Sequence, residues 1–170
     1  MSLLSVDPGL SATGWALWHD GSLVCCGLVR AFGGTDAERS AVVGAGLILR
    51  TAALECGAAR TLVELPQIYR AVKAKGDPND VVRVAALVGW IEASFPRAVH
   101  ERASPHDWKG TIPKARRLRD YVVHERNAKA LGLCYLRWFE TCPESLAHNV
   151  ADAVGLGLWW LKRQQPRRLK

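Results

Sequence analysis

The chain has 170 residues and a mass of 18.6 kDa, and 49% of its residues are hydrophobic. This size and composition predict a single domain over residues 1–170 with its own core, and they exclude a disordered tail. No apolar run is long enough for a membrane span, and residues 1–18 lack the basic start of a signal peptide. Five cysteines without a CxxC pair argue against a disulfide scaffold or a zinc module, and favour a reducing, cytoplasmic setting.

The charge is positive overall and unevenly distributed. Lys and Arg number 23 against 16 Asp and Glu, which gives a formal net charge of +7. Residues 1–64 hold four basic and six acidic residues, whereas residues 65–170 hold nineteen and ten. A basic second half favours a polyanionic partner, most commonly nucleic acid. The alternative is a soluble protein that merely has a positive surface.

The first part of the chain predicts three strands and a helix. Residues 3–7, 13–19 and 23–30 have the apolar patterns of strands, and Asp20-Gly21 is a hairpin turn signal between the last two. Residues 37–56 are rich in Ala and Leu and predict a helix that ends near Gly57.

The second part alternates strands and helices. A strand is predicted over residues 61–64, then a basic loop over 68–78 and a helix over 80–95 that Asn79 could cap. A last strand is predicted over 98–101, a helical turn over 105–109, and helices over 114–131 and 144–162. This order predicts an α/β protein with a five-stranded mixed sheet flanked by helices.

Three acidic residues stand where a sheet of this kind places its ligands. Asp7 and Glu64 end predicted strands, and Asp152 lies in a long apolar helix, with Asn149 and His148 three and four residues before it. A buried carboxylate is costly unless it is paired or bound to a metal. Such an oxygen-rich site would favour Mg²⁺ or Mn²⁺ over Zn²⁺. The alternative gives each acid a separate structural role, with Asp152 exposed.

Three motifs in the chain resemble those of RuvC-family Holliday junction resolvases. Ser-Val-Asp-Pro-Gly-Leu-Ser-Ala-Thr-Gly-Trp at 5–15 resembles the opening of that family. Val-Glu-Leu-Pro at 63–66 resembles its second motif, and Ala-Asp-Ala-Val-Gly-Leu at 151–156 its last. The motifs occur in the family's order and cover most of the chain. The short chain and the Glu-Leu-Pro variant look most like bacteriophage members.

The resemblance implies an RNase H-like fold, a homodimer and a crossover junction endodeoxyribonuclease that makes paired symmetric nicks in four-way junctions. It implies two Mg²⁺ ions per active site, with Mn²⁺ as a substitute, and Asp7, Glu64 and Asp152 as ligands. The family's fourth ligand lies three residues before the last Asp, where this chain has Asn149. His148 is kept as the alternative fourth ligand.

The resemblance also implies the residues that contact DNA. Tyr69 is expected to stack on an unpaired base, and its alternative is an ordinary loop tyrosine. Phosphate contacts are expected from four lysines and one arginine: Arg70, Lys73, Lys75, Lys109 and Lys114. Lys109 is also expected to stabilise charge at the scissile phosphate, as a catalytic residue.

The helix over 81–95 is the expected dimer interface, since family dimers use it. It has small apolar residues at near-helical spacing, which permit close packing of helices. The alternative is that these residues pack on the sheet of their own chain.

Two other functions use the same residues. One is an RNase H-like nuclease that acts on other branched DNA or on RNA–DNA hybrids, and comparison of substrates would separate it. The other is a non-catalytic junction-binding protein whose acids are structural. Metal dependence and an Asp7 variant would separate that one.

Overall fold

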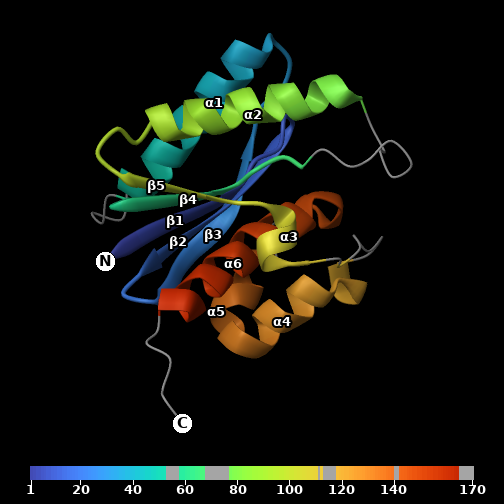
Figure 1. Cartoon of the computed structure of the whole chain (residues 1–170). Helices are drawn as coiled ribbons and strands as arrows, with labels where there is room; N and C mark the ends of the chain where they lie inside the picture. The colour runs from blue at the N-terminus through green and yellow to red at the C-terminus, as the bar shows by residue number, and fades with distance from the viewer. Residues whose placement is uncertain (53–57, 68–76, 111, 113–117, 140–141, 165–170) are drawn as a thin grey trace.

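The structure is a computed structural model, and it describes residues 1–52, 58–67, 77–110, 112, 118–139 and 142–164. Five strands form one sheet, in the order β3-β2-β1-β4-β5 (Figure 1). They are β1 (Ser2–Asp7), β2 (Ala12–His19), β3 (Ser22–Arg30), β4 (Arg60–Glu64) and β5 (Val99–Ala103). β1, β2 and β3 pair antiparallel, and β4 pairs parallel with both β1 and β5. The predicted five-stranded mixed sheet is confirmed.

The predicted hairpin between β2 and β3 is confirmed by its backbone geometry. Asp20 has φ 47° and Gly21 has φ 79°. Positive φ at both central residues is what a two-residue hairpin turn requires, because this twist matches that of the flanking strands. The Asp-Gly pair therefore fixes the register of the two strands.

Helices cover both faces of the sheet (Figure 1). One layer consists of α1 (Asp36–Ala52) and α2 (Pro78–Ala93). The other has α6 (Glu144–Gln164) against the sheet, with α4 (Val122–Leu131) and α5 (Leu133–Leu136) beside it. The short helix α3 (Pro105–Trp108) leads from β5 toward α6. No helix in the described parts of the chain is long and apolar enough to cross a membrane.

Alternation along the strands determines which side chains meet each layer. Leu4, Val6 and Val63 belong to the cluster under α1 and α2, whereas Leu3 and Leu62 belong to the cluster under α6. Successive side chains of a strand point to opposite faces. Asp7 and Glu64, which continue the series of Leu3 and Leu62, therefore lie on the α6 side.

Helix α6 lies unusually close to β1 and β2 because two glycines leave room for it. A Cβ on Gly14 would stand 2.0 Å from the carbonyl oxygen of Asn149, and one on Gly157 would stand 2.3 Å from Trp18 Nε1. The Ser5 hydroxyl donates a hydrogen bond to the carbonyl oxygen of Ala153, at 2.8 Å. Sheet and helix are thus joined both by packing and by a buried hydrogen bond.

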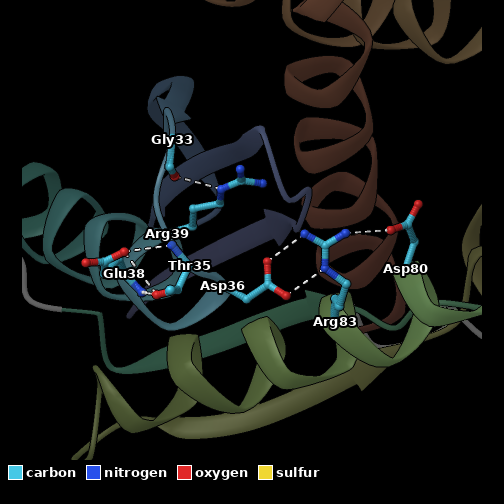
Figure 2. A network of polar contacts seen from close by, with 7 residues as sticks. All are labelled: Gly33, Thr35, Asp36, Glu38, Arg39, Asp80 and Arg83. Carbon is cyan, nitrogen blue, oxygen red and sulfur yellow. Dashed lines mark hydrogen bonds and ion pairs between the residues drawn. The ribbon is translucent and has the colours of Figure 1, made fainter.

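A polar network joins α1 to α2 on the opposite side of the sheet. Arg83 of α2 donates two hydrogen bonds to Asp36 of α1, both at 2.6 Å, and one to Asp80 at 2.9 Å (Figure 2). Thr35 and Glu38 bond to each other across the first turn of α1. These contacts fix the start of α1 against α2.

Two local predictions are wrong. α2 is capped by Asp77, whose side chain accepts from the backbone N–H of Asn79 at 2.8 Å, and it begins at Pro78 rather than after Asn79. Proline suits the first position of a helix because that position needs no N–H partner. The helix expected over 114–131 is not continuous: its first four residues lie outside the described residues, and residues 118–131 form a 3-10 turn, η2 (Leu118–Asp120), followed by α4. Tyr121 between them has φ −90° and ψ 112°, which is extended backbone.

The predictions did not include α5 and the 3-10 turn η3 (Arg137–Phe139). α1 matches the start of its predicted helix within one residue, and the predicted end at residue 56 lies outside the described residues. β5 runs two residues further than expected, to Ala103.

Candidate active site

The three acids predicted from the sequence lie at one edge of the sheet. Val6 of β1 pairs with Val63 of the parallel strand β4, so Asp7 and Glu64 follow side by side at the carboxyl ends of the two strands. Asp152 of α6 is 1% exposed, which excludes the alternative of a solvent-facing acid. The side chain of Glu64 is 12% exposed.

A buried lysine lies between two of these carboxylates. Lys109 follows α3, and its Nζ is 3.0 Å from Asp152 Oδ2 and 3.4 Å from Glu64 Oε2. Its side chain is 11% exposed. Burial alone would lower the pKa of Lys109, but the charges of Asp152, Glu64 and Asp7 outweigh it and raise that pKa above its ordinary value. Lys109 is therefore a charged internal counter-ion for the acidic cluster.

A capped turn holds Lys109 in place. The Ser104 side chain accepts from the backbone N–H of Asp107, and the Asp107 carboxylate accepts from the backbone N–H of Ser104 at 2.8 Å. This reciprocal capping box fixes the start of α3. The backbone N–H of Lys109 then bonds to the carbonyl of Pro105 at 3.0 Å, so the lysine leaves the turn at a defined point.

Two aromatic residues donate hydrogen bonds to the same two carboxylates. Trp108 Nε1 donates to Glu64 Oε2 at 2.6 Å, and the Tyr121 hydroxyl donates to Asp152 Oδ1. Burial, and then the charge of Asp152, raises the pKa of Tyr121, so its hydroxyl stays protonated and remains a donor. Each aromatic residue thus orients one carboxylate, and neither was identified from the sequence.

Burial also affects Glu64 itself. It raises the pKa of Glu64 above its ordinary value, and the charge of Asp152 acts in the same direction, while Lys109 and the bond from Trp108 oppose the shift. A carboxylate in this setting needs a nearby cation to stay ionised near neutral pH.

The two candidates for the fourth ligand lie one turn before Asp152. Asn149 is half-buried, and its Nδ2 donates to the carbonyl oxygen of Ala12 at 2.9 Å. This bond leaves Oδ1 as the atom of that side chain that could bind a cation. His148 is also half-buried, on the same first half of α6.

The carboxylate oxygens of the acidic cluster suit a hard divalent cation, although those of Glu64 and Asp152 already contact the ammonium of Lys109. Within the described ranges, no three His, Cys, Asp or Glu side chains are arranged as a ready metal cage. The ammonium of Lys109 instead lies within 3.5 Å of oxygens from two carboxylates. Oxygen donors that already surround a cation are the chemistry that Mg²⁺ requires.

Most of the predicted DNA contacts lie outside the described residues. These are Tyr69, Arg70, Lys73, Lys75 and Lys114. Of the predicted contacts, Lys109 is described, and the structure brings it to the acidic cluster.

Comparison by sequence finds no protein-family model and no curated protein that matches this chain. Comparison by structure does find similar folds. Thermus thermophilus RuvC in complex with a Holliday junction substrate superposes with a TM-score of 0.62 at 14% identity, over 96% of both chains. The Fowlpox virus resolvase in complex with Holliday junction DNA gives 0.59 at 12% identity, over 98% of this chain and 100% of that one.

The yeast mitochondrial Holliday junction resolvase Ydc2 gives a TM-score of 0.54 at 15% identity, over 96% of this chain and 81% of that one. These three proteins come from a bacterium, a virus and a mitochondrion, and all match nearly the whole of this chain. The chain therefore has the RuvC-like, RNase H-like fold of these three proteins, a five-stranded mixed sheet flanked by helices.

Proposed function

We propose that this chain is a crossover junction endodeoxyribonuclease, which resolves four-way DNA junctions by paired symmetric nicks. The observation that carries the proposal is the acidic cluster itself. Glu64 and Asp152 come from β4 and α6, Asp7 ends the neighbouring strand, and a buried cation already lies between two of their carboxylates. The cluster sits in a fold whose solved examples include two complexes with Holliday junctions.

Phosphodiester hydrolysis needs an activated water and a stabilised leaving oxygen, and two bound Mg²⁺ ions supply both. Asp7, Glu64 and Asp152 would hold them, with Oδ1 of Asn149, or else His148, as the fourth ligand. Mn²⁺ has the same preference for oxygen and is expected to substitute. Trp108 and Tyr121 keep one oxygen of each carboxylate engaged, which aims the other toward the cation.

Lys109 has two roles in this proposal. In the protein without DNA it neutralises Glu64 and Asp152. With the carboxylates otherwise satisfied, its ammonium is free to donate to a non-bridging oxygen of the scissile phosphate, where negative charge increases in the transition state.

The test mixes the purified chain with an immobile synthetic four-way junction and Mg²⁺, and maps the nicks. Asp7→Asn and an EDTA sample run alongside, and Asp36→Asn serves as a matched control, because Asp36 lies in the surface network of α1. We expect paired nicks in opposing strands that Asp7→Asn and EDTA abolish and Asp36→Asn leaves unchanged. Junction binding without nicks would favour a non-catalytic binder. Cleavage of RNA–DNA hybrids instead would favour the other RNase H-like activity.

A homodimer is the second part of the proposal, and the exposed face of α2 supports it. Its members recur at helical spacing and are all exposed: Val82, Ala85, Ala86, Gly89, Trp90 and Ala93. The residues of α2 that pack on the sheet are instead Leu87, Val88 and Ile91. The alternative that the small residues pack on their own sheet is therefore wrong. An apolar stripe with two small residues and a glycine at its centre suits a second helix at close range.

Light scattering at micromolar concentration tests the dimer. Ala86→Glu places a charge in the middle of the stripe and is expected to give a monomer. Leu49→Glu is the matched control, since Leu49 is exposed on α1 and should leave the dimer intact. A wild-type chain that is already monomeric would contradict this part of the proposal. The odd count of five cysteines, with free thiols at Cys25, Cys26, Cys134 and Cys142, supports a reducing, cytoplasmic location, which in a viral protein would be that of the host.

A further inference from the structure

A groove beside the acidic cluster has no role in the function proposed above. Its volume is about 190 Å³, and it lies between α3, α4 and α6. The residues that line it are Trp108, Lys109, Val123, Arg126, Asn127, Gly155, Leu158, Trp159 and Lys162. Trp108 and Lys109 also contact the catalytic carboxylates, so the groove and the acidic cluster share two residues.

The groove runs along α6 on the same helical face as Asp152. Gly155, Trp159 and Lys162 follow Asp152 at three, seven and ten residues, and so lie along one face of α6. At Gly155 a Cβ would stand 2.7 Å from Val123 Cγ1 and 2.8 Å from Trp108 Cζ3. The glycine thus lets α3 and α4 approach α6 at the floor of the groove.

The lining carries three basic side chains, Lys109, Arg126 and Lys162, and no Asp or Glu. Lys109 is paired with Glu64 and Asp152 of the acidic cluster. Arg126 and Lys162 are exposed, and neither forms an ion pair with any residue that the structure describes. Other described cations, such as Arg97, Lys129 and Arg137, also lack an ion pair among the described residues. Arg126 and Lys162 differ from these because they line a groove that adjoins the acidic cluster.

The aromatic rings of the groove are already covered by cations. Lys109 Nζ lies 4.8 Å from the centre of the Trp108 ring, and Arg163 Cζ lies 4.8 Å from that of Trp159. Rings covered in this way hold cations in place and are poor platforms for stacking a base. The chemistry of the groove favours a phosphate over an unpaired base.

We propose that this groove binds the phosphates of the cleaved strand next to the scissile position. Arg126 and Lys162 are the contacts, and Lys109 is the point at which the strand enters the active site. The inference rests on the proposed function, because that function supplies the DNA strand. A groove of about 190 Å³ has room for a phosphate group.

The first test measures junction binding by the double variant Arg126→Ala/Lys162→Ala, in EDTA so that no cleavage occurs. Each lost phosphate contact is expected to lower the slope of log affinity against log salt by about 0.9. The double variant should therefore lose about 2 from the slope, and at least about tenfold in affinity at low salt. The charge-preserving variant Arg126→Lys/Lys162→Arg should restore both.

The matched control is Lys129→Ala/Arg137→Ala, which removes the same charge from exposed positions of α4 and η3 outside the groove. It is expected to change affinity less than twofold. A groove variant that behaves like this control would overturn the inference.

A second test locates the contact on the DNA. Methylphosphonates replace the phosphates of the cleaved strand one at a time, which removes one charge at each position. Neutral positions next to the nick should weaken binding by the wild type and leave the groove variant unaffected. Equal losses in both proteins at every position would overturn the inference.

The outcomes separate this inference from the proposed function, since binding in EDTA does not depend on cleavage. A chain that binds through the groove and never nicks would keep the phosphate contacts of Arg126 and Lys162 and would lose the nuclease activity. If the wild type nicks normally and the groove variant binds the junction as well as the control variant does, only the inference about the groove is overturned. A wild-type chain that does not bind junction DNA would overturn both.

Discussion

Among the described residues, one basic side chain bridges two carboxylates in two places. On the surface, Arg83 bridges Asp36 and Asp80 (Figure 2), and these side chains are 37%, 44% and 52% exposed. At the acidic cluster, Lys109 bridges Glu64 and Asp152, with 11%, 12% and 1% exposure. Water screens the first set, so its ion pairs add little to stability. The second set is isolated from water, and each of its charges depends on the others.

The two basic side chains also hold their partners differently. The guanidinium of Arg83 binds Asp36 through two short, parallel hydrogen bonds, which give a fixed geometry. Lys109 makes contacts of 3.0 to 3.5 Å with its two carboxylates and is a single charge on a flexible stem. Arg83 is therefore held firmly by its carboxylates, whereas Lys109 can be replaced by another cation at Glu64 and Asp152.

The largest effect is expected from Lys109→Met, which removes the bridging cation from the buried set. Two buried carboxylates are left uncompensated, so the free energy of unfolding should fall by about 3 kcal/mol in EDTA. Mg²⁺ should restore more stability to this variant than to the wild type, and single-turnover cleavage should drop about 100-fold or more. Denaturant unfolding with and without Mg²⁺ measures the first effect. Equal stability of variant and wild type in EDTA would contradict the role of Lys109 as a counter-ion.

Tyr121→Phe should have the next largest effect, because it removes one donor from buried Asp152. We expect cleavage to slow about 10-fold to 100-fold while junction affinity stays the same. Tyr135→Phe is the matched control, since Tyr135 is equally buried and its hydroxyl contacts His124 instead. If both variants slowed cleavage equally, Tyr121 would not be a positioning residue.

The pH dependence of stability should have opposite signs in the two sets. Burial raises the pKa of Glu64 above its ordinary 4.5, so in the window above 4.5 the folded chain holds a proton that the unfolded chain has lost. The stability due to this group therefore falls as pH rises through that window. The bond from Arg83 lowers the pKa of Asp36, so the stability due to Asp36 is present above its ordinary 3.8 and is lost as pH falls below it.

Unfolding from pH 3 to 7 in EDTA, compared with Glu64→Gln and Asp36→Asn, measures these two slopes. As pH rises, the free energy of unfolding of the wild type should fall relative to that of Glu64→Gln. It should rise relative to that of Asp36→Asn. Slopes of the same sign would show that burial does not control Glu64.

The smallest effect is expected from Arg83→Met in the surface set. Its carboxylates remain solvated when the guanidinium is removed, so the melting temperature should change little, and less still at high salt. Cleavage should match that of the wild type. A loss of stability comparable to that of Lys109→Met would remove the distinction between the two sets.

The places of the three acids in the fold could be predicted from the sequence because each acid belongs to a local pattern. Asp7 and Glu64 directly follow apolar strands, and Asp152 interrupts an apolar helix. Parallel pairing of β1 and β4 then brings the first two together, as expected. The hairpin and the five strands of the mixed sheet followed from patterns of the same local kind.

Trp108 and Tyr121 could not be found in this way, because their partners are 44 and 31 residues away. A local sequence pattern cannot predict a hydrogen bond between residues so far apart in the chain. The extended backbone at Tyr121 has no local signal either, since the residues around it have ordinary helix propensities and a single helix was predicted there. The position of Lys109 between two acids likewise depends on where α3 meets α6.

Two glycines at the contact between α6 and the sheet, Gly14 of β2 and Gly157 of α6, affect the geometry of the acidic cluster. Gly14 and Gly157 allow the helix to lie against β1 and β2, and Ser5 ties it there through Ala153, the neighbour of Asp152. The separation of Asp152 from Asp7 is thus set by the thickness of a packed interface and not by a loop. A larger side chain at either position would push α6 away from the sheet and would therefore move Asp152 away from Asp7.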